Sequence, residues 1–139
     1  MSKYRKPNSS KGLAVLAARI ADDKIAKDIL ILNLTKIHEA PSDYFVICSC
    51  DSENQMRAIV EAVEEGCLEV GLKRPKVEGY TSSSWIILDF FDVVMHIMLR
   101  ASREFYNIER IWNDAQFAVL DDEGKPKTVK DYRLAAKFA

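Results

Sequence analysis

The chain has 139 residues, the length of one ordinary domain. Hydrophobic residues make up 48% of it and charged residues 29%, which excludes a disordered, collagen-like or mucin-like protein. The three cysteines fit reduced thiols better than a disulfide framework, and no apolar run approaches the ~20 residues that a membrane-spanning helix needs. We therefore expect one soluble, cytoplasmic domain that does not enter a membrane.

The net charge of −1 is unevenly distributed along the chain. Residues 1–12 carry four bases and no acid, whereas residues 13–118 carry 11 bases and 17 acids, a net charge of −6. A negative body repels phosphate backbones and favours a basic protein partner. A solvated acidic surface that keeps the protein soluble explains the same charge equally well.

A basic tail, a helix and two buried strands are expected in the first third of the chain. Residues 1–12 lack a hydrophobic period and predict a flexible tail. The helical spacing of apolar residues from position 13 onward predicts a helix that ends near Asp23. The nearly continuous apolar runs at 28–34 and 44–48 are typical of strands buried on both faces.

A capping box marks the clearest helix of the sequence. Ser52 is its predicted N-cap, with Gln55 three residues later, and Gly71 is a natural C-terminal stop. The apolar stripe of this helix consists of Met56, Ile59, Val60, Val63, Cys67 and Val70.

Further strands and short helices are expected in the second half. Residues 75–79 can form an edge strand, where proline is tolerated. The apolar runs at 85–90 and 93–98 are separated by almost nothing, which predicts an antiparallel hairpin. The remaining expected elements are one or two amphipathic helices marked by Phe105, Ile108, Ile111 and Trp112, a turn or linker at 121–126, and a weak helix over 131–138.

This order of elements predicts an α/β protein of the α+β kind, a single domain with helices packed on a mixed β-sheet. We place the domain at residues 13–118 and treat residues 119–139 as a C-terminal extension of unknown role.

Few residues suggest catalysis. Asp89 and Asp92 bracket the hairpin turn and, with Asp43 as a third ligand, could hold Mg²⁺ for nucleotidyl transfer. Aspartates that hydrogen-bond their own turn backbone are far commoner. The histidines and cysteines lack the spacing of a metal site, and the glycines form no phosphate-binding loop, so we expect no metal and no cofactor.

Trp85 and His96 each allow two interpretations. Trp85 opens a strand after a polar serine loop, so it is either a core residue at the rim of the sheet or an anchor for a partner. His96 lies within an apolar strand, where a hydrogen-bonded structural histidine is the usual case.

Six segments in the same order resemble the Iojap-related ribosomal silencing factors, over about residues 13–115. They are ADDKIAKDI (21–29), SDYFVICS (42–49), VEG (77–79), WIILD (85–89), DVVMH (92–96) and REFYNIERIW (103–112). The resemblance implies a nucleotidyltransferase-like fold without its catalysis, usually in a homodimer. It also implies binding to ribosomal protein number fourteen on the large subunit, which blocks joining of the small subunit and lowers translation when nutrients are scarce.

The resemblance also suggests which residues meet the partner. The candidates are Trp85, Asp89, Asp92, Met95 and His96 in the hairpin, followed by Glu104 and Tyr106. The basic tail is expected to add a minor contact with ribosomal RNA. Our first hypothesis is thus a silencing factor that is not an enzyme, and the alternative is a Mg²⁺-dependent nucleotidyltransferase that uses Asp89 and Asp92.

Three positions depart from the family pattern. Phe91, Cys50 and Asn113 stand where glycine is common in the family. If the position of Phe91 requires a positive φ, the phenylalanine is strained there.

Overall fold

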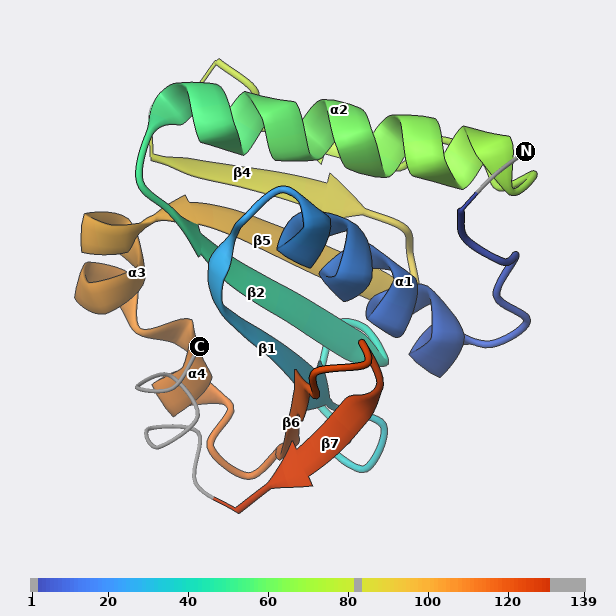
Figure 1. Ribbon diagram of the computed structural model, residues 1–139. Coiled ribbons are helices and arrows are strands. Elements are labelled where there is room, and N and C mark those ends of the chain that lie inside the picture. Colours follow the sequence, from blue (N-terminus) through green and yellow to red (C-terminus); the bar gives the residue numbers. More distant parts are fainter. Residues whose placement is uncertain (1–2, 82–83, 131–139) are drawn as a thin grey trace.

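A seven-stranded mixed β-sheet with helices packed on it forms the body of the protein (Figure 1), in a computed structural model that describes residues 3–81 and 84–130. The strands lie in the order β3-β4-β5-β2-β1-β6-β7. β2 and β5 run parallel and the other neighbouring pairs are antiparallel. The strands are β1 (Lys27–Asn33), β2 (Tyr44–Cys50), β3 (Lys76–Glu78), β4 (Trp85–Asp89), β5 (Val93–Leu99), β6 (Gln116–Leu120) and β7 (Pro126–Val129). The predicted α+β fold with a mixed sheet is confirmed.

Two long helices cover one face of this sheet (Figure 1). They are α1 (Ser10–Asp23) and α2 (Glu53–Glu69), and the core beneath them contains Ile20, Ile59, Leu88 and many further apolar side chains. Ser52 is the N-cap as predicted, because its Oγ accepts from the Gln55 amide at 3.1 Å. The second half of the capping box is shifted by one residue, since Gln55 Oε1 accepts from the Asp51 amide at 2.8 Å. None of the helices in the described residues is long and apolar enough to cross a membrane.

A glycine lets the two helices approach each other closely. A Cβ atom on Gly66 of α2 would lie 2.7 Å from Cδ1 of Ile20 on α1. The cost of a glycine inside a helix is therefore offset by tight packing between the helices.

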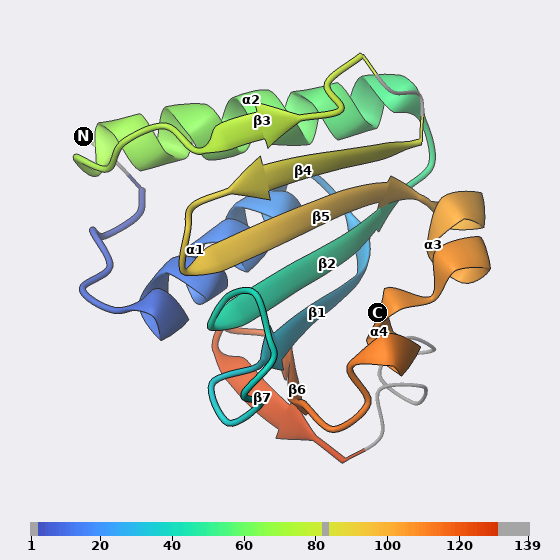
Figure 2. The same ribbon diagram turned by 180° about the vertical axis from the view of Figure 1, so that it is seen from behind.

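The opposite face of the sheet carries a second, smaller core. Its buried members are Leu30, Leu32, Leu34, Phe45, Ile47, Met98, Ile108 and Phe117. The short helices α3 (Arg100–Tyr106) and α4 (Ile108–Ile111) pack at one end of this face, and none of the helices within residues 3–81 and 84–130 covers the middle of β4, β5 and β2 (Figure 2).

The C-terminal part adds two strands that the sequence did not reveal. The predicted turn at 121–126 is present, but its flanks form the antiparallel pair β6 and β7, and β6 extends the sheet beside β1. The expected boundary between 118 and 119 falls within β6. The strands are short and mostly part-exposed, so they lack the apolar run that marks β1 and β2. The predicted helix over 131–138 lies outside the described residues.

The N-terminal segment packs against the body, unlike the flexible tail that its composition predicts. Ser9 caps α1 by accepting from the Gly12 amide at 3.0 Å. Tyr4 is half-buried against the main core, and its hydroxyl donates to the Asp23 carboxylate. Burial of this one aromatic ring and a 3.0 Å ion pair between Lys3 and Asp23 hold the segment in place.

The strain expected at the hairpin turn is present. Phe91 adopts a φ of 77° and its side chain is exposed. Cys50 and Asn113, the other two unusual positions, have no positive φ. Cys50 is instead a buried residue of β2 with a free thiol.

Candidate functional site

A cluster of aromatic side chains lies where β4 and β5 meet α3. The centroid of the Trp85 ring lies 4.9 Å from that of Tyr106 and 5.8 Å from that of His96. The rings of Tyr106 and Phe105 are in turn 5.0 Å apart, again between centroids. We call Trp85, Phe105 and Tyr106 the aromatic patch. It brings together two segments that lie some 20 positions apart in the sequence, and it includes two of the predicted partner-binding residues.

His96 supports the patch from below. The Trp85 indole Nε1–H donates to His96 Nδ1 at 3.1 Å, while Phe45 packs edge-on against the imidazole at 4.6 Å. Burial of His96, together with the nearby Arg103 charge, lowers its pKa to about 4. The imidazole is therefore neutral at physiological pH, as expected of a structural histidine.

A buried arginine fastens α3 to the sheet. Arg103 Nε donates to Glu109 at 3.2 Å, and Nη1 donates to the Asp28 carbonyl at 2.6 Å and to Ser49 Oγ at 3.0 Å. The guanidinium thus ties α3 to α4 and to the ends of β1 and β2. Since Tyr106 ends this helix, Arg103 also fixes the position of the patch.

The surface around the patch is apolar and exposed. Phe105 is 81% exposed and Ile111 is 67% exposed, although their helical spacing predicts core positions. The spacing misleads because Asn107 adopts a left-handed conformation with φ 44° and divides the segment into α3 and α4. Glu104, the other predicted partner-binding residue of this segment besides Tyr106, is exposed and lines a shallow hollow with Phe105 and Ile111.

Asp89 and Asp92 lie at the other end of the hairpin, away from the patch. Asp89 Oδ1 accepts from the Phe91 amide at 2.8 Å, so this carboxylate stabilises the turn. The side chain of Asp92 is exposed, and its backbone carbonyl accepts from the Asp43 amide at 2.9 Å. Four positions along β4 separate Asp89 from Trp85, about 13 Å.

These three aspartates do not assemble a metal site. Within residues 3–81 and 84–130, no group of three or more His, Cys, Asp or Glu side chains is arranged to hold a metal ion. The ligand set of the alternative nucleotidyltransferase hypothesis is therefore not brought together in this part of the chain.

Met95 faces away from the other candidates. It is fully buried in the core between the sheet and the long helices, paired with Leu88 across β4 and β5. Alternation along β5 sends Met95 to the helix side and His96 to the opposite side. A partner on the aromatic patch cannot reach Met95, and the surface that we propose leaves it out.

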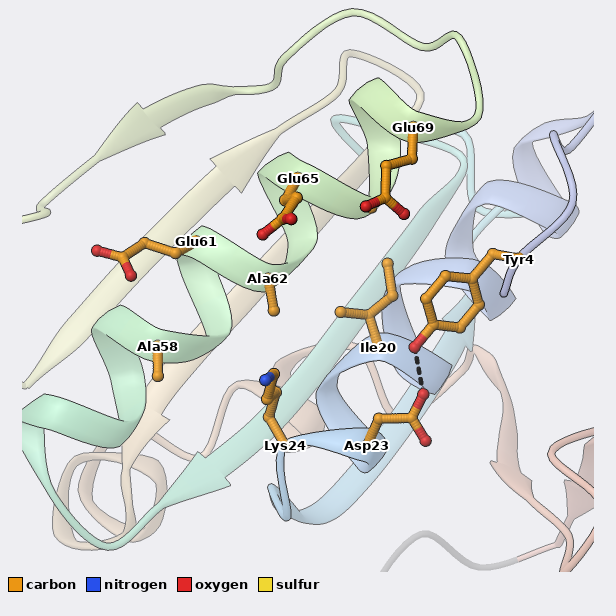
Figure 3. A pocket seen from close by; sticks show the side chains of 10 residues that line it. Tyr4, Ile20, Asp23, Lys24, Ala58, Glu61, Ala62, Glu65 and Glu69 are labelled. Atoms are coloured by element: carbon orange, nitrogen blue, oxygen red, sulfur yellow. Dashed lines mark hydrogen bonds between the residues drawn. The ribbon is translucent and has the colours of Figure 1, made fainter. Parts of the chain in front are cut away.

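A second hollow lies on the helix-covered side, between α1 and α2 (Figure 3). Small side chains, Ala58 and Ala62, form part of its lining, and Tyr4 closes one end. The carboxylates of Glu61, Glu65 and Glu69 follow one another along the α2 side. This hollow contributes to the acidic character of the body and is separate from the aromatic patch.

Comparison with known proteins finds relatives that are similar in sequence. The family model described as "Ribosomal silencing factor during starvation" matches residues 7–138. The chain is 37% identical over 113 residues to the ribosomal silencing factor RsfS of Bacillus subtilis, which covers 81% of this chain and 95% of that protein.

Two further similarities extend the comparison. The mouse protein named mitochondrial assembly of ribosomal large subunit protein 1 is 29% identical over 109 residues, covering 73% of this chain and 47% of that protein. A crystal structure of a Chromobacterium violaceum protein superposes with a TM-score of 0.70 and 30% identity, covering 76% of this chain and 87% of that one.

Proposed function

Because the chain belongs to the family of ribosomal silencing factors, we propose that it represses translation by binding the large ribosomal subunit in the cytoplasm and blocking the joining of the small subunit. The proposed partner on that subunit is ribosomal protein number fourteen, and the proposed effect is strongest when nutrients are limiting. The protein acts by steric exclusion and is not an enzyme.

The aromatic patch is the single observation that best supports this proposal. A fixed tryptophan beside exposed Phe105 and Tyr106 has the composition of a protein-binding hot spot. The acidic body suits a basic ribosomal protein, and Glu104 at the margin of the patch carries the same sign of charge. Asp89 and Asp92, at the far end of the hairpin, add at most to the rate of association.

Subunit joining tests the proposal directly. Trp85→Ala should weaken binding to purified large subunits by about 30-fold and raise the concentration that blocks joining by a similar factor. Tyr80→Ala is the matched control, because it removes another part-exposed aromatic ring that lies outside the patch. Thermal melts establish that both variants are folded. A folded Trp85→Ala protein that blocks joining like the parent contradicts the proposed surface.

The alternative function has its own test. A nucleotidyltransferase should transfer nucleotide in the presence of Mg²⁺, and Asp89→Asn should abolish that activity. A silencing factor with the surface proposed here needs no nucleotide, and Asp89→Asn should slow its association only slightly.

We also propose a homodimer in solution and a minor contact between the basic N-terminal segment and ribosomal RNA. Light scattering at tens of micromolar tests the dimer, and a strictly monomeric mass contradicts it. For the segment, replacing Arg5 and Lys6 by alanine should flatten the salt dependence of ribosome binding. Binding at low salt should persist in that variant.

A further inference from the structure

We infer that His96 is a positioning residue, whose Nδ1 atom fixes the orientation of the Trp85 indole on the partner-binding surface. The inference rests on the proposed function for its biological meaning. Its structural part can be measured without the ribosome.

The register of the sheet places the two residues for this contact. Trp85 pairs with Met98 and Ile87 pairs with His96 across β4 and β5, so Trp85 and His96 are diagonal neighbours on one face. Diagonal neighbours on two strands are far enough apart that only long or aromatic side chains touch. Trp85 and His96 do so through the 3.1 Å hydrogen bond from Trp85 Nε1 to His96 Nδ1.

The bond also determines the state of the imidazole. An indole N–H can only donate, so His96 Nδ1 must be an unprotonated acceptor and the ring proton must sit on Nε2. Burial and the Arg103 charge both disfavour a second proton on this ring. The acceptor is therefore available at physiological pH.

The imidazole is itself held rigidly. His96 is 6% exposed, and Phe45 packs edge-on against it at 4.6 Å. Trp85, in contrast, is only half-buried and has Tyr106 on its other side at 4.9 Å. The rigid histidine thus fixes a side chain that would otherwise sample several rotamers on the surface.

A histidine is a costly choice for packing alone. Its Nε2 atom has no hydrogen-bond partner among the residues that the structure describes, and an unsatisfied buried donor lowers stability. A phenylalanine would fill the same space without that cost. The gain that offsets it is orientation, because a side chain ordered before binding loses less entropy when a partner arrives.

Two substitutions separate positioning from packing. His96→Phe keeps a ring but removes the acceptor, whereas His96→Asn restores an acceptor oxygen near the position of Nδ1. Both are made together with Trp112→Phe, so that Trp85 is the remaining tryptophan and its fluorescence reports on this site alone.

The first measurement is made on the free protein. We expect His96→Phe to lower the fluorescence anisotropy of Trp85 and to shift its emission to longer wavelength, with a melting temperature at or above that of the parent. His96→Asn should keep the parent signal. An unchanged Trp85 signal in a folded His96→Phe protein overturns the inference.

The second measurement is binding to large ribosomal subunits. His96→Phe should weaken binding roughly tenfold, the cost of ordering one large side chain, and His96→Asn should stay close to the parent. In a Trp85→Phe background, His96→Phe should have no further effect. If it weakens binding equally there, His96 does not act through Trp85 and the inference fails.

The two proposals fail in different ways. If Trp85→Ala binds large subunits normally, the proposed surface is wrong, whatever the fluorescence shows. If Trp85→Ala loses binding while His96→Phe keeps both its fluorescence and its affinity, the surface stands and the positioning role is wrong.

Discussion

The two faces of the sheet differ in what they bury. The face under α1 and α2 is closed by aliphatic side chains, with Ile59, Leu88 and Met95 fully buried. None of the helices in the described residues covers the middle of the opposite face (Figure 2). This face carries the aromatic patch. Among the described residues, the buried polar or charged side chains are Ser49, His96, Arg103 and Glu109. Hydrogen bonds and ring contacts join all four to the second face or to the helices packed on it.

This difference separates the part of the chain that provides stability from the part that positions a binding surface. Aliphatic packing is non-directional and needs only volume and burial. Polar groups in a core require specific partners, and any partner that is missing lowers stability. Nε2 of His96 and Nη2 of Arg103 have no partner among the described residues, and both atoms lie on the second face. The polar groups are thus concentrated where side chains must be held in one orientation.

The largest expected effect comes from two adjacent residues of β4. Leu88 points to the helices and is fully buried, whereas Ile87 points to the open face and is half-buried. Leu88→Ala should lower the free energy of unfolding by about 3–5 kcal/mol, because it leaves a cavity. Ile87→Ala should cost about 1–2 kcal/mol, because water fills the space that is left.

Urea unfolding measures both variants. Large-subunit binding should weaken only for Ile87→Ala, because Ile87 points to the face that carries the aromatic patch. Leu88→Ala must be assayed at a temperature below its unfolding transition. Equal losses of stability would mean that the two faces contribute alike, and the distinction drawn between them would fail.

The next effect is the pH dependence that His96 gives to stability. Its pKa is lowered from 6.5 to about 4 in the folded protein by burial and by Arg103, so the unfolded chain takes up a proton first as the pH falls. Stability should therefore decrease between pH 6.5 and pH 4, by up to about 3 kcal/mol. His96→Phe should lack this part of the pH dependence while keeping that of the carboxylates. Unfolding curves at pH 7 and pH 4 for both proteins test this, and parallel losses would contradict the buried neutral state of His96.

The sequence predicted the helix-covered face better than the open one. Continuous apolar runs and the Ser52 capping box identify β1, β2 and α2, because periodicity and caps are local signals. The hairpin of β4 and β5 followed from the short spacing between its strands. The short helices α3 and α4 were harder to predict, since the left-handed Asn107 interrupts the helix between them and leaves Phe105 and Ile111 exposed.

Which of the candidate partner-binding residues lie together on one surface could be seen only in the folded structure. Trp85 was a candidate from its position after the serine loop and Tyr106 from the resemblance, but their contact depends on how α3 folds back over the end of the sheet. Met95 was named with them, although alternation along β5 sends it to the opposite face. Arg103 gave no separate signal, because an arginine in a helix reads as a surface residue until its buried partner Glu109 is placed beside it.

A smaller effect is expected at the hairpin turn. Phe91 holds a φ of 77°, which costs a residue with a side chain about 1–2 kcal/mol. Phe91→Gly should raise the free energy of unfolding by about 0.5–1 kcal/mol, since the flexibility of glycine in the unfolded chain offsets part of the gain. Phe91→Ala keeps the strain and should show no such increase.

Binding assays on the same two variants define the extent of the partner surface. Both should bind large subunits like the parent, because Phe91 lies at the other end of the hairpin from Trp85. A loss of binding in both variants would extend the surface to the turn and to Asp89 and Asp92.

The smallest expected effect concerns Tyr4, which packs at the edge of the helix-covered face. Tyr4→Phe keeps the ring against Ile20 and Gly66 but removes the hydroxyl that donates to Asp23. Burial alone would raise the Asp23 pKa, but hydrogen bonds from Tyr4 and Lys3 outweigh it and lower that pKa below its usual 3.8. The pair is part-exposed, so the loss of stability at pH 7 should be below about 1 kcal/mol.

The pH dependence of this small effect identifies its origin. A carboxyl whose folded pKa is lowered contributes stability above its unfolded pKa and loses that contribution as the pH falls through the folded value. The difference between parent and Tyr4→Phe should therefore be present at pH 7 and shrink as the pH falls below 3.8. Tyr80→Phe is the matched control, because the Tyr80 hydroxyl also donates to a carboxylate, that of Glu61, at the longer distance of 3.4 Å. This variant should change stability less. A Tyr4→Phe loss well above 1 kcal/mol, unchanged at low pH, would show that polar contacts support the helix-covered face too, and the contrast between the faces would then be one of degree.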